Sequence, residues 1–317
     1  MTTIVRSAVG SLAAIGFLKF LSENKFKIIG TDITSLSIGK FYVDNFYEVP
    51  KADQVEAVIK KYLTICENEN AKWIISGPET EVLVLIREKT QFENIGVHIL
   101  HPDYATLEII TDKLNLYKFF KKKGINMPFS CDLQKDETTS LKGKVVLKPK
   151  QGRGSTGIYF TGAQQLGIYK KIIPVENYIA QEFIEGEEYT VDVLYDLEGN
   201  ILNIVPRKRL KIDSGVSVIG ETVKDEKLFE LIVELSSHLK FVGGNCFQFI
   251  KSPSKEYFLT DINPRFGGGS ILALKASESF RKNLCNLLNG NYESFIKLSL
   301  DFEIIRMYRS YEEVFKN

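Results

Sequence analysis

Histidine and cysteine are scarce in this sequence, which limits the metal and redox chemistry that it can support. Its 317 residues include three histidines and four cysteines, and no two cysteines form a CxxC pair. Zinc sites and disulfide frameworks need clustered ligands of these two types, so the sequence predicts neither. Scattered cysteines are typical of a reducing compartment, and we expect a cytoplasmic protein.

An excess of charge of one sign and a long apolar run are missing as well. Lysine and arginine number 41 against 40 acidic residues, which leaves a net charge of +1. We therefore expect no nucleic-acid partner and no anionic membrane partner, and any bound anion must be held locally. Lys19 interrupts the apolar run Ala8–Leu21, and no stretch approaches the ~20 uncharged residues of a membrane span.

The first hundred residues alternate between apolar strands and helices. Strands are predicted at Thr3–Ala8, Lys27–Thr31, Trp73–Ser76 and His98–Leu100, and helices at Ser11–Ser22, Val55–Glu67 and Glu79–Glu93. This alternation predicts a parallel sheet in one Rossmann-like α/β lobe. The Gly10-Ser11 turn lacks the GxGxxG spacing of a dinucleotide site, so we interpret the lobe as one wall of a small-molecule cleft. Ser76–Glu79, at the end of a central strand, is a candidate for substrate contact.

From residue 111 onward the pattern changes to strands joined by short turns. Strands are predicted at Lys144–Lys148, Tyr178–Ile184, Tyr189–Tyr195, Asn200–Lys211, Gly243–Ile250 and Lys255–Asn263. Helices are predicted at Asp112–Lys123, Ala163–Lys171, Leu228–Leu239 and Ile271–Leu288. Hairpins of this kind indicate an antiparallel α+β arrangement.

A glycine-rich segment, Gly152–Gly157, follows the strand that carries Lys148. It matches GxGxxG, but the β-branched and aromatic residues Ile158–Phe160 come next, so it joins two strands of a hairpin and does not open a helix. The backbone N–H groups and two hydroxyls of such a flap can cover phosphates. A mobile surface hairpin is the alternative, and the nearby Lys148 favours phosphate.

The stretch Tyr257–Gly269 places Asp261, Asn263 and Arg265 on alternate residues of one strand, so the three side chains should share a face. Gln248 is the polar exception on its own strand, and we expect it opposite Asp261 and Asn263. We also expect a bulge near Pro264. The glycines at 267–269 would let the backbone approach a ligand closely.

Two further charged clusters each have two interpretations. Glu185–Glu188 interrupt an apolar strand, and they form either a charged turn or a site where backbone groups meet a base and a carboxylate holds a ribose. Arg207–Arg209 either hold a substrate carboxylate or lie at a solvated strand end.

Taken in order, these motifs resemble the ATP-grasp superfamily, in particular its branch with the carbamoyl-phosphate synthase large chain. The resemblance covers Thr111 to about Leu288. It implies a Rossmann-like pre-ATP-grasp domain at residues 1–110. An ATP-grasp fold of two α+β subdomains follows, a small one at 111–180 with the flap and a large one at 181–317 with the metal site.

The resemblance also implies roles for individual residues. Lys113 and Lys148 match the residues that contact ATP phosphates, beneath a flap that includes Gly152, Gly154, Ser155, Thr156 and Gly157. Glu182, Phe183 and Ile184 match the hinge that binds adenine, and Glu188 matches the acid that holds the ribose. Gln248, Asp261 and Asn263 match ligands of Mg²⁺, for which Mn²⁺ is an alternative. Arg265 matches the arginine beside the γ-phosphate, and Arg265 and Lys148 are the expected catalytic residues.

The implied activity is an ATP-dependent ligase that converts a carboxylate into an acyl phosphate, which an amine or ammonia then attacks. Its partners would be these small molecules, and analogy with the family also implies a homodimer. Asp261 stands where the family usually has glutamate and reaches one methylene less far, so one bound metal and two bound metals are both alternatives. We expect a single ATP-grasp unit without a carboxylase-type C-terminal domain. The alternatives are a small-molecule kinase on the same scaffold and a nucleotide-binding module without turnover. The absence of HRD and DFG triplets excludes the protein-kinase fold.

Overall fold

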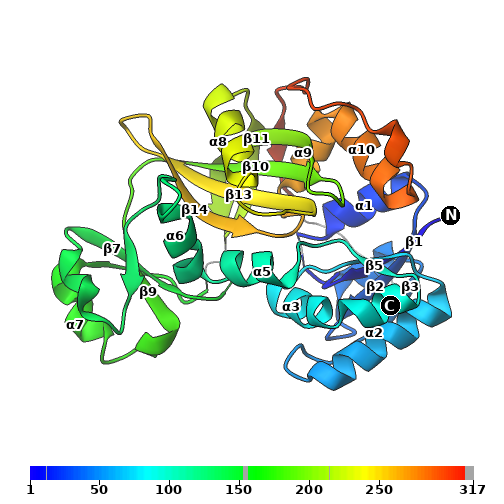
Figure 1. Cartoon of the computed structure of the whole chain (residues 1–317), viewed down its shortest axis with the longest axis horizontal. Helices are drawn as coiled ribbons and strands as arrows, with labels where there is room; N and C mark the ends of the chain where they lie inside the picture. Colours follow the sequence, from blue (N-terminus) through cyan, green and yellow to red (C-terminus); the bar gives the residue numbers. More distant parts are fainter. Residues whose placement is uncertain (12, 153–155, 214, 311–317) are drawn as a thin grey trace.

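The computed structural model describes residues 1–11, 13–152, 156–213 and 215–310, and these form three β-sheets. The sheet that comes first in the chain is parallel, and the other two are antiparallel. Figure 1 shows the small antiparallel sheet and the parallel sheet on opposite sides of the molecule, with the large antiparallel sheet between and above them in this view. The predicted fold class, a Rossmann-like α/β lobe followed by an α+β pair, is confirmed.

Five parallel strands in the order β3-β2-β1-β4-β5 form the first lobe. The strands are β1 (Thr3–Ser7), β2 (Lys27–Asp32), β3 (Asn45–Glu48), β4 (Trp73–Ile75) and β5 (His98–Ile99). The helices are α1 (Ile15–Glu23), α2 (Val55–Glu69), α3 (Glu79–Arg87) and α4 (Lys89–Asn94), with a 3₁₀ segment η1 (Ile38–Tyr42). The order reverses between β1 and β4, which opens a crevice at the carboxyl ends of these two strands.

Two predictions for this lobe need correction. The helix predicted over Glu79–Glu93 is two helices, because Glu88 leaves helical geometry with φ −102° and ψ 19°. The edge strand β3 was not predicted, since its four residues are exposed or half-buried and carry no apolar pattern.

The small antiparallel sheet has the order β6-β9-β7-β8. Its strands are β6 (Ser130–Asp132), β7 (Lys144–Pro149), β8 (Tyr159–Gly162) and β9 (Tyr178–Glu182). Helices α5 (Tyr104–Ile110) and α6 (Lys113–Lys121) lead into it, and η2 (Asp136–Ser140), η3 (Ala163–Gln165), α7 (Leu166–Tyr169) and η4 (Val175–Asn177) connect its strands. β7 and β8 pair antiparallel, so the predicted hairpin is confirmed. The domain limit predicted between residues 180 and 181 lies inside β9, because the chain leaves this sheet only after Glu182; the domain limits stay predictions.

The large antiparallel sheet has the order β14-β13-β10-β11-β12-β15. Its strands are β10 (Glu187–Tyr195), β11 (Ile201–Asp213), β12 (Val216–Thr222), β13 (Gly243–Lys251), β14 (Tyr257–Asn263) and β15 (Arg306–Tyr308). Its helices are α8 (Glu226–Ser236), α9 (Ser270–Ala276) and α10 (Glu278–Asn289), followed by η5 (Tyr292–Ser294). The single helix predicted over Ile271–Leu288 is broken at Ser277, which adopts φ −121° and ψ 114° and caps α10 with its side chain.

The first lobe and the large sheet share one apolar core. The rings of Phe17 in α1 and Phe266 after β14 stack with centroids 4.5 Å apart, and the buried Trp73 donates a hydrogen bond of 2.8 Å to the carbonyl of Leu288. This packing fixes the first lobe against the strands that carry the polar residues described next. None of the helices in the described ranges has the length and apolar composition needed to cross a membrane.

Candidate active site

A row of polar side chains crosses the large sheet in direct register. Gln248 pairs with Asp261 on one side and with Thr190 on the other, and Thr190 in turn pairs with Arg207. The predicted juxtaposition of Gln248 and Asp261 is therefore confirmed, while Asn263 pairs with Cys246 in the next row. Residues directly opposite one another on one face of a sheet have Cβ atoms about 4.5–5.5 Å apart, so the row forms a continuous surface.

The bulge in β14 lies at a different place from the predicted one. The pairing shifts between Gln248 and Phe249, whose partners are Asp261 and Leu259, so Thr260 is the extra residue. A bulge at Thr260, and not near Pro264, turns both Leu259 and Ile262 into the core and leaves Asp261 and Asn263 on the polar face.

Hydrogen bonds connect Asp261 and Asn263 of β14 with Arg265 and with the first lobe; Arg265 lies in a bend just after β14 and not on the strand as predicted. Asn263 donates from Nδ2 to Asp261 Oδ2 (3.2 Å) and accepts at Oδ1 from Arg265 Nη2 (3.0 Å). The same Arg265 nitrogen lies 3.5 Å from Glu79 Oε1, in the first turn of α3. The predicted clustering of Asp261, Asn263 and Arg265 is present, and a phosphate approaching Arg265 would compete with Asn263 and Glu79 for its nitrogens.

Two lysines from the small subdomain face this surface. Lys148, half-buried at the end of β7, donates from Nζ to Gln181 Oε1 (2.7 Å). Lys113, the first residue of α6, reaches the carbonyl of Gly152 with its Nζ (3.3 Å). Desolvation lowers the pKa of Lys148 to about 8 and Lys113 adds to this effect, although Asp261 and Glu188 oppose it. The ammonium of Lys148 therefore titrates close to neutral pH.

This lowered pKa leads to a prediction for nucleotide binding. The charged ammonium attracts phosphate, so a bound triphosphate raises the pKa of Lys148, and the protein takes up a proton on binding when the free protein has lost it. The affinity for an ATP analogue should accordingly fall as the pH rises through about 8. Calorimetric titration across this range measures the effect. A Lys148→Met protein should bind more weakly at every pH and lack this step, and unchanged affinity would show that Lys148 makes no phosphate contact.

These residues line a single cleft of about 720 Å³ between the three sheets. The first lobe contributes Arg6, Gly10, Ser11, Gly77 and Pro78, and the small subdomain contributes Lys113, Lys148, Gly152 and Thr156. The large sheet contributes Glu188, Arg207, Arg209, Gln248, Asp261, Asn263 and Arg265. The cleft therefore brings together residues that are more than 150 positions apart in the sequence.

The structure places some of the predicted flap residues at the cleft. Gly152 and Thr156 line the cleft, and Gly157 adopts φ +72°, where an added Cβ would lie 2.7 Å from the Tyr178 hydroxyl. Gly154 and Ser155, both predicted phosphate contacts, lie outside the described residues.

The predicted adenine hinge is not part of the cleft wall. Glu182 accepts a hydrogen bond from the Phe129 amide (3.3 Å), and the Phe183 ring lies 3.9 Å from the Lys144 ammonium. Neither residue lines the cleft, nor does Ile184. Glu188 does, and it forms a 2.8 Å ion pair with Arg209.

Two family matches account for most of the chain. The family described as ATP-grasp domain matches residues 110–269, half of the sequence, and the PylC-like N-terminal domain matches residues 13–100. The chain belongs to the ATP-grasp family. This confirms the resemblance seen in the motifs.

Similar proteins include much larger ones. The multifunctional protein pyrABCN of Emericella nidulans is 25% identical over 272 residues, which cover 79% of this chain and 12% of that protein. The carbamoyl phosphate synthase large chain of Pyrococcus furiosus is 21% identical over 287 residues, which cover 82% of this chain and 27% of that protein. The chain thus spans between an eighth and about a quarter of the length of these relatives.

Solved structures of similar size share the fold. The N5-carboxyaminoimidazole synthetase of Staphylococcus aureus has a TM-score of 0.74 at 14% identity and covers 96% of this chain and 80% of its own. An L-amino acid ligase of Bacillus licheniformis has a TM-score of 0.69 at 14% identity and covers 94% of this chain and 78% of its own. These likenesses confirm an ATP-grasp fold.

The glycines of this ATP-grasp chain at 267–269 approach a side chain of the protein itself. A Cβ on Gly269 would lie 2.4 Å from Arg207 Cζ, and a Cβ on Gly267 would lie 3.1 Å from Cys246 Sγ. The run lines the cleft, and it also closes over Arg207, so the approach of a ligand to this backbone stays a prediction. The sequence could not reveal this contact, since Arg207 is 62 positions away.

The Gly269→Ala variant should be destabilised by about 1–3 kcal/mol, because the added methyl group overlaps the Arg207 guanidinium. The backbone itself is unstrained at φ −91°, so the effect is purely steric. Gly167→Ala is the matched control, since its Cβ meets nothing within 4 Å. Urea unfolding of both proteins measures the difference, and equal midpoints would contradict the close approach of Gly269 to Arg207.

Nothing in the sequence indicated that His101 contributes to the site. His101 follows β5, accepts a hydrogen bond at Nε2 from the Ser76 amide (3.0 Å), and lies with Nδ1 2.7 Å from the Pro264 carbonyl. Burial lowers the pKa of His101 to about 4, so the ring is neutral at physiological pH and Nδ1 carries the proton that it donates. His101 thereby ties the segment between Asn263 and Arg265 to the first lobe.

Asp32, at the end of β2 in the first lobe, accepts hydrogen bonds from groups of the protein itself. Asp32 accepts hydrogen bonds from the Gly10 amide (2.7 Å), the Ile33 amide (2.8 Å) and the Ser37 hydroxyl (3.3 Å). These contacts hold the Gly10-Ser11 turn in place, in agreement with the structural interpretation of this lobe.

Proposed function

We propose that this protein is an ATP-dependent ligase that activates a carboxylate as an acyl phosphate for attack by an amine or ammonia. The observation that carries the proposal is the meeting of Lys148, Asp261 and Arg265 in one cleft, although they come from two different sheets and a following loop. Phosphoryl transfer depends on positioning and on charge neutralisation more than on a nucleophile in the protein.

The proposed reaction has two steps. A carboxylate oxygen of the substrate attacks the γ-phosphorus of ATP, and ADP leaves with the electrons of the broken P–O bond. The amine then attacks the acyl carbon, and inorganic phosphate leaves. Lys113 and Lys148 would hold the phosphate oxygens, and Arg265 would stabilise the charge on the transferred group.

The residues of the metal row fit Mg²⁺, with Mn²⁺ as the alternative. Gln248, Asp261 and Asn263 offer oxygen ligands, the type that these hard cations prefer. Within the described residues no group of three or more histidine, cysteine, aspartate or glutamate side chains could hold a metal. Asp261 is the one carboxylate among the three proposed metal ligands. Phosphate oxygens of the nucleotide would complete the coordination. When bound, the cation would neutralise charge on the phosphates.

The adenosine moiety would extend toward the small subdomain. Glu188 would accept the ribose hydroxyls, at the cost of its partly buried ion pair with Arg209. Glu182, Phe183 and Ile184 would contact adenine, below a flap that includes Gly152, Gly154, Ser155, Thr156 and Gly157. The names of the similar proteins, a synthetase, a ligase and a carbamoyl phosphate synthase, support a ligase. None of the four cysteines, all of which the structure describes, forms a disulfide, which supports a cytoplasmic location.

The test is the release of phosphate from ATP in the presence of a panel of carboxylates and amines. The proposal predicts release only when both are present, and transfer of isotopic oxygen from the labelled carboxylate to the phosphate. Phosphate found on an alcohol would identify a small-molecule kinase. Nucleotide binding without turnover against the whole panel would identify a binding module, and either result would overturn the proposal.

A further inference from the structure

The polar row of the large sheet continues past the proposed metal residues to Arg207. This arginine has no role in the phosphoryl transfer proposed above. Arg207 on β11 pairs with Thr190, which pairs with Gln248. Its neighbour Lys208 points to the other face and pairs with Glu187, so Arg207 alone of the two belongs to the cleft. This placement rules out the interpretation of Arg207 as part of a solvated strand end.

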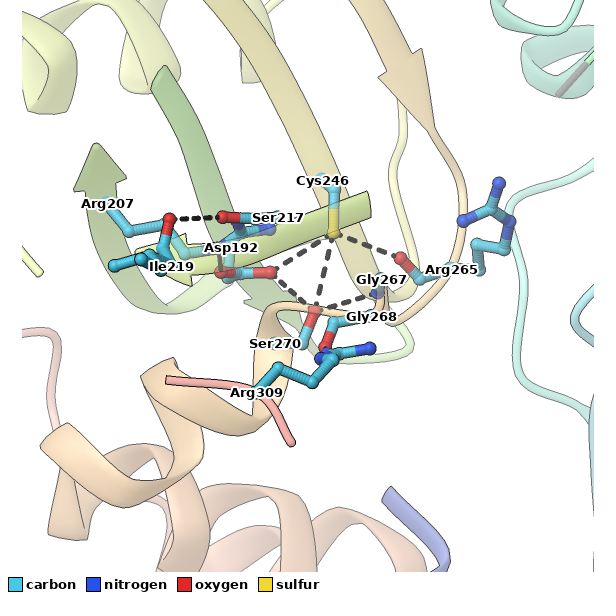
Figure 2. A network of polar contacts seen from close by, with 10 residues as sticks. All are labelled: Asp192, Arg207, Ser217, Ile219, Cys246, Arg265, Gly267, Gly268, Ser270 and Arg309. Carbon is cyan, nitrogen blue, oxygen red and sulfur yellow. Dashed lines mark hydrogen bonds and ion pairs between the residues drawn. The ribbon is translucent and has the colours of Figure 1, made fainter. Parts of the chain in front are cut away.

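The buried carboxylate of Asp192 fixes the orientation of the Arg207 side chain. Its Nε donates to Asp192 Oδ2 (2.7 Å), and the other carboxylate oxygen of Asp192 accepts from the Ser270 hydroxyl and from the Cys246 thiol (3.1 Å), as Figure 2 shows. Burial and the neighbouring Asp192 raise the pKa of Cys246 to about 12, so its thiol stays protonated and donates. Three donors therefore satisfy the carboxylate of Asp192, which is fully buried.

Apart from Asp192, the Arg207 guanidinium has only the Cys246 sulfur as a side-chain partner among the described residues. Arg207 is only 4% exposed, yet within the described part of the chain its two terminal nitrogens donate to no oxygen atom. Gly269 covers one face of the guanidinium, and the residue lines the cleft. A guanidinium that is buried, oriented and donates to no oxygen atom from its two terminal nitrogens matches the geometry of a carboxylate or a phosphate.

We infer that Arg207 binds a second acidic group, a carboxylate or a phosphate, on one of the molecules that the proposed ligase joins. This inference rests on the proposed function and adds the class of substrate. Asp192 is the positioning residue that orients Arg207, and the loop at 267–270 fixes both through Ser270 and the Gly267 amide (2.8 Å).

The second acidic group is distinct from the one that reacts. Arg207 lies on β11, three strands away from β14 in the sheet, whereas Arg265 lies just after the end of β14. Figure 2 also shows the Arg265 guanidinium directed away from Arg207. The two guanidinium groups therefore do not converge on a single carboxylate, and the substrate must carry two separate acidic groups.

Binding of matched ligand pairs tests this inference without requiring turnover. The pairs differ by one acidic group: succinate and propionate, aspartate and alanine, phosphoserine and serine. Each is titrated by calorimetry into the protein saturated with magnesium and a non-hydrolysable ATP analogue. The acidic member of at least one pair should bind at least about a hundredfold more tightly than its neutral partner, since a buried charged contact contributes strongly to affinity. The carboxylate and phosphate pairs distinguish the two sources of the acid.

The variants assign the preference to Arg207. Arg207→Met should abolish it, and Arg207→Lys, which keeps a charge beside Asp192 and guards against misfolding, should reduce it at least tenfold because lysine lacks the fork. Lys208→Met, altered on the opposite face, should keep it. A preference that survives in both Arg207 variants, or equal binding of both members of every pair, would overturn the inference. Failure of the ligase proposal would appear separately, as acid binding without phosphate release.

Discussion

Replacing Asp261 with asparagine should lower kcat by about a thousandfold, while the protein still binds nucleotide. Asp261 is the one carboxylate among the proposed metal residues, and its Oδ2 accepts from Asn263 in the chain of contacts that leads to Arg265. An amide of the same shape keeps the packing but no longer neutralises a cation. It also removes a charge that raises the pKa of Lys148, so that pKa should fall further.

Steady-state kinetics and calorimetry on the same preparation separate the two effects of Asp261→Asn. The kcat should fall steeply, and the affinity for the ATP analogue should fall much less, because Lys113, Lys148 and Arg265 remain. Asp301→Asn, at an exposed position outside the cleft, is the control and should behave as the unaltered protein. Turnover at the normal rate in Asp261→Asn would contradict the assignment of Asp261 as a metal ligand.

Replacing Asp192 with alanine should destabilise the fold by about 3–5 kcal/mol, a large part of the stability of a typical domain. The change leaves Arg207 charged and buried without its acid, and it removes the acceptor of Ser270 and Cys246. Guanidinium unfolding monitored by circular dichroism measures the loss.

Two comparisons show whether this loss comes from the buried charge. The double variant Asp192→Leu with Arg207→Met should recover most of the stability, because it removes both charges and keeps the volume apolar. Glu278→Ala breaks the exposed pair with Lys282 and should leave the midpoint nearly unchanged. If Asp192→Ala unfolded at the same midpoint as the unaltered protein, Arg207 would not depend on Asp192 for its charge or its orientation.

The sequence reveals those parts of the site that depend on local geometry. Alternation along one strand is a property of the extended backbone, so Asp261 and Asn263 could be placed on one face from their spacing alone, whereas Arg265 lies beyond the end of the strand. The opposition of Gln248 and Asp261 follows from a hairpin with a short turn, Ser252–Glu256, which sets the register. The exclusion of a helix after Gly157 likewise rests on local propensity.

The remaining features depend on contacts between distant segments. The bulge at Thr260, the break at Ser277 and the cover of Gly269 over Arg207 are settled by packing, which no local pattern encodes. His101 and Asp192 were missed because each acts through residues far away in the chain. The roles of Glu182, Phe183 and Ile184 stay predictions, since they do not line the cleft.

A crystal structure with magnesium and a non-hydrolysable ATP analogue tests the central claim most directly. The account predicts the γ-phosphate between Lys148 and Arg265, with the cation bound to oxygens of Asp261 and Asn263. A nucleotide bound outside this cleft, or a cation held by neither of these two residues, would contradict it.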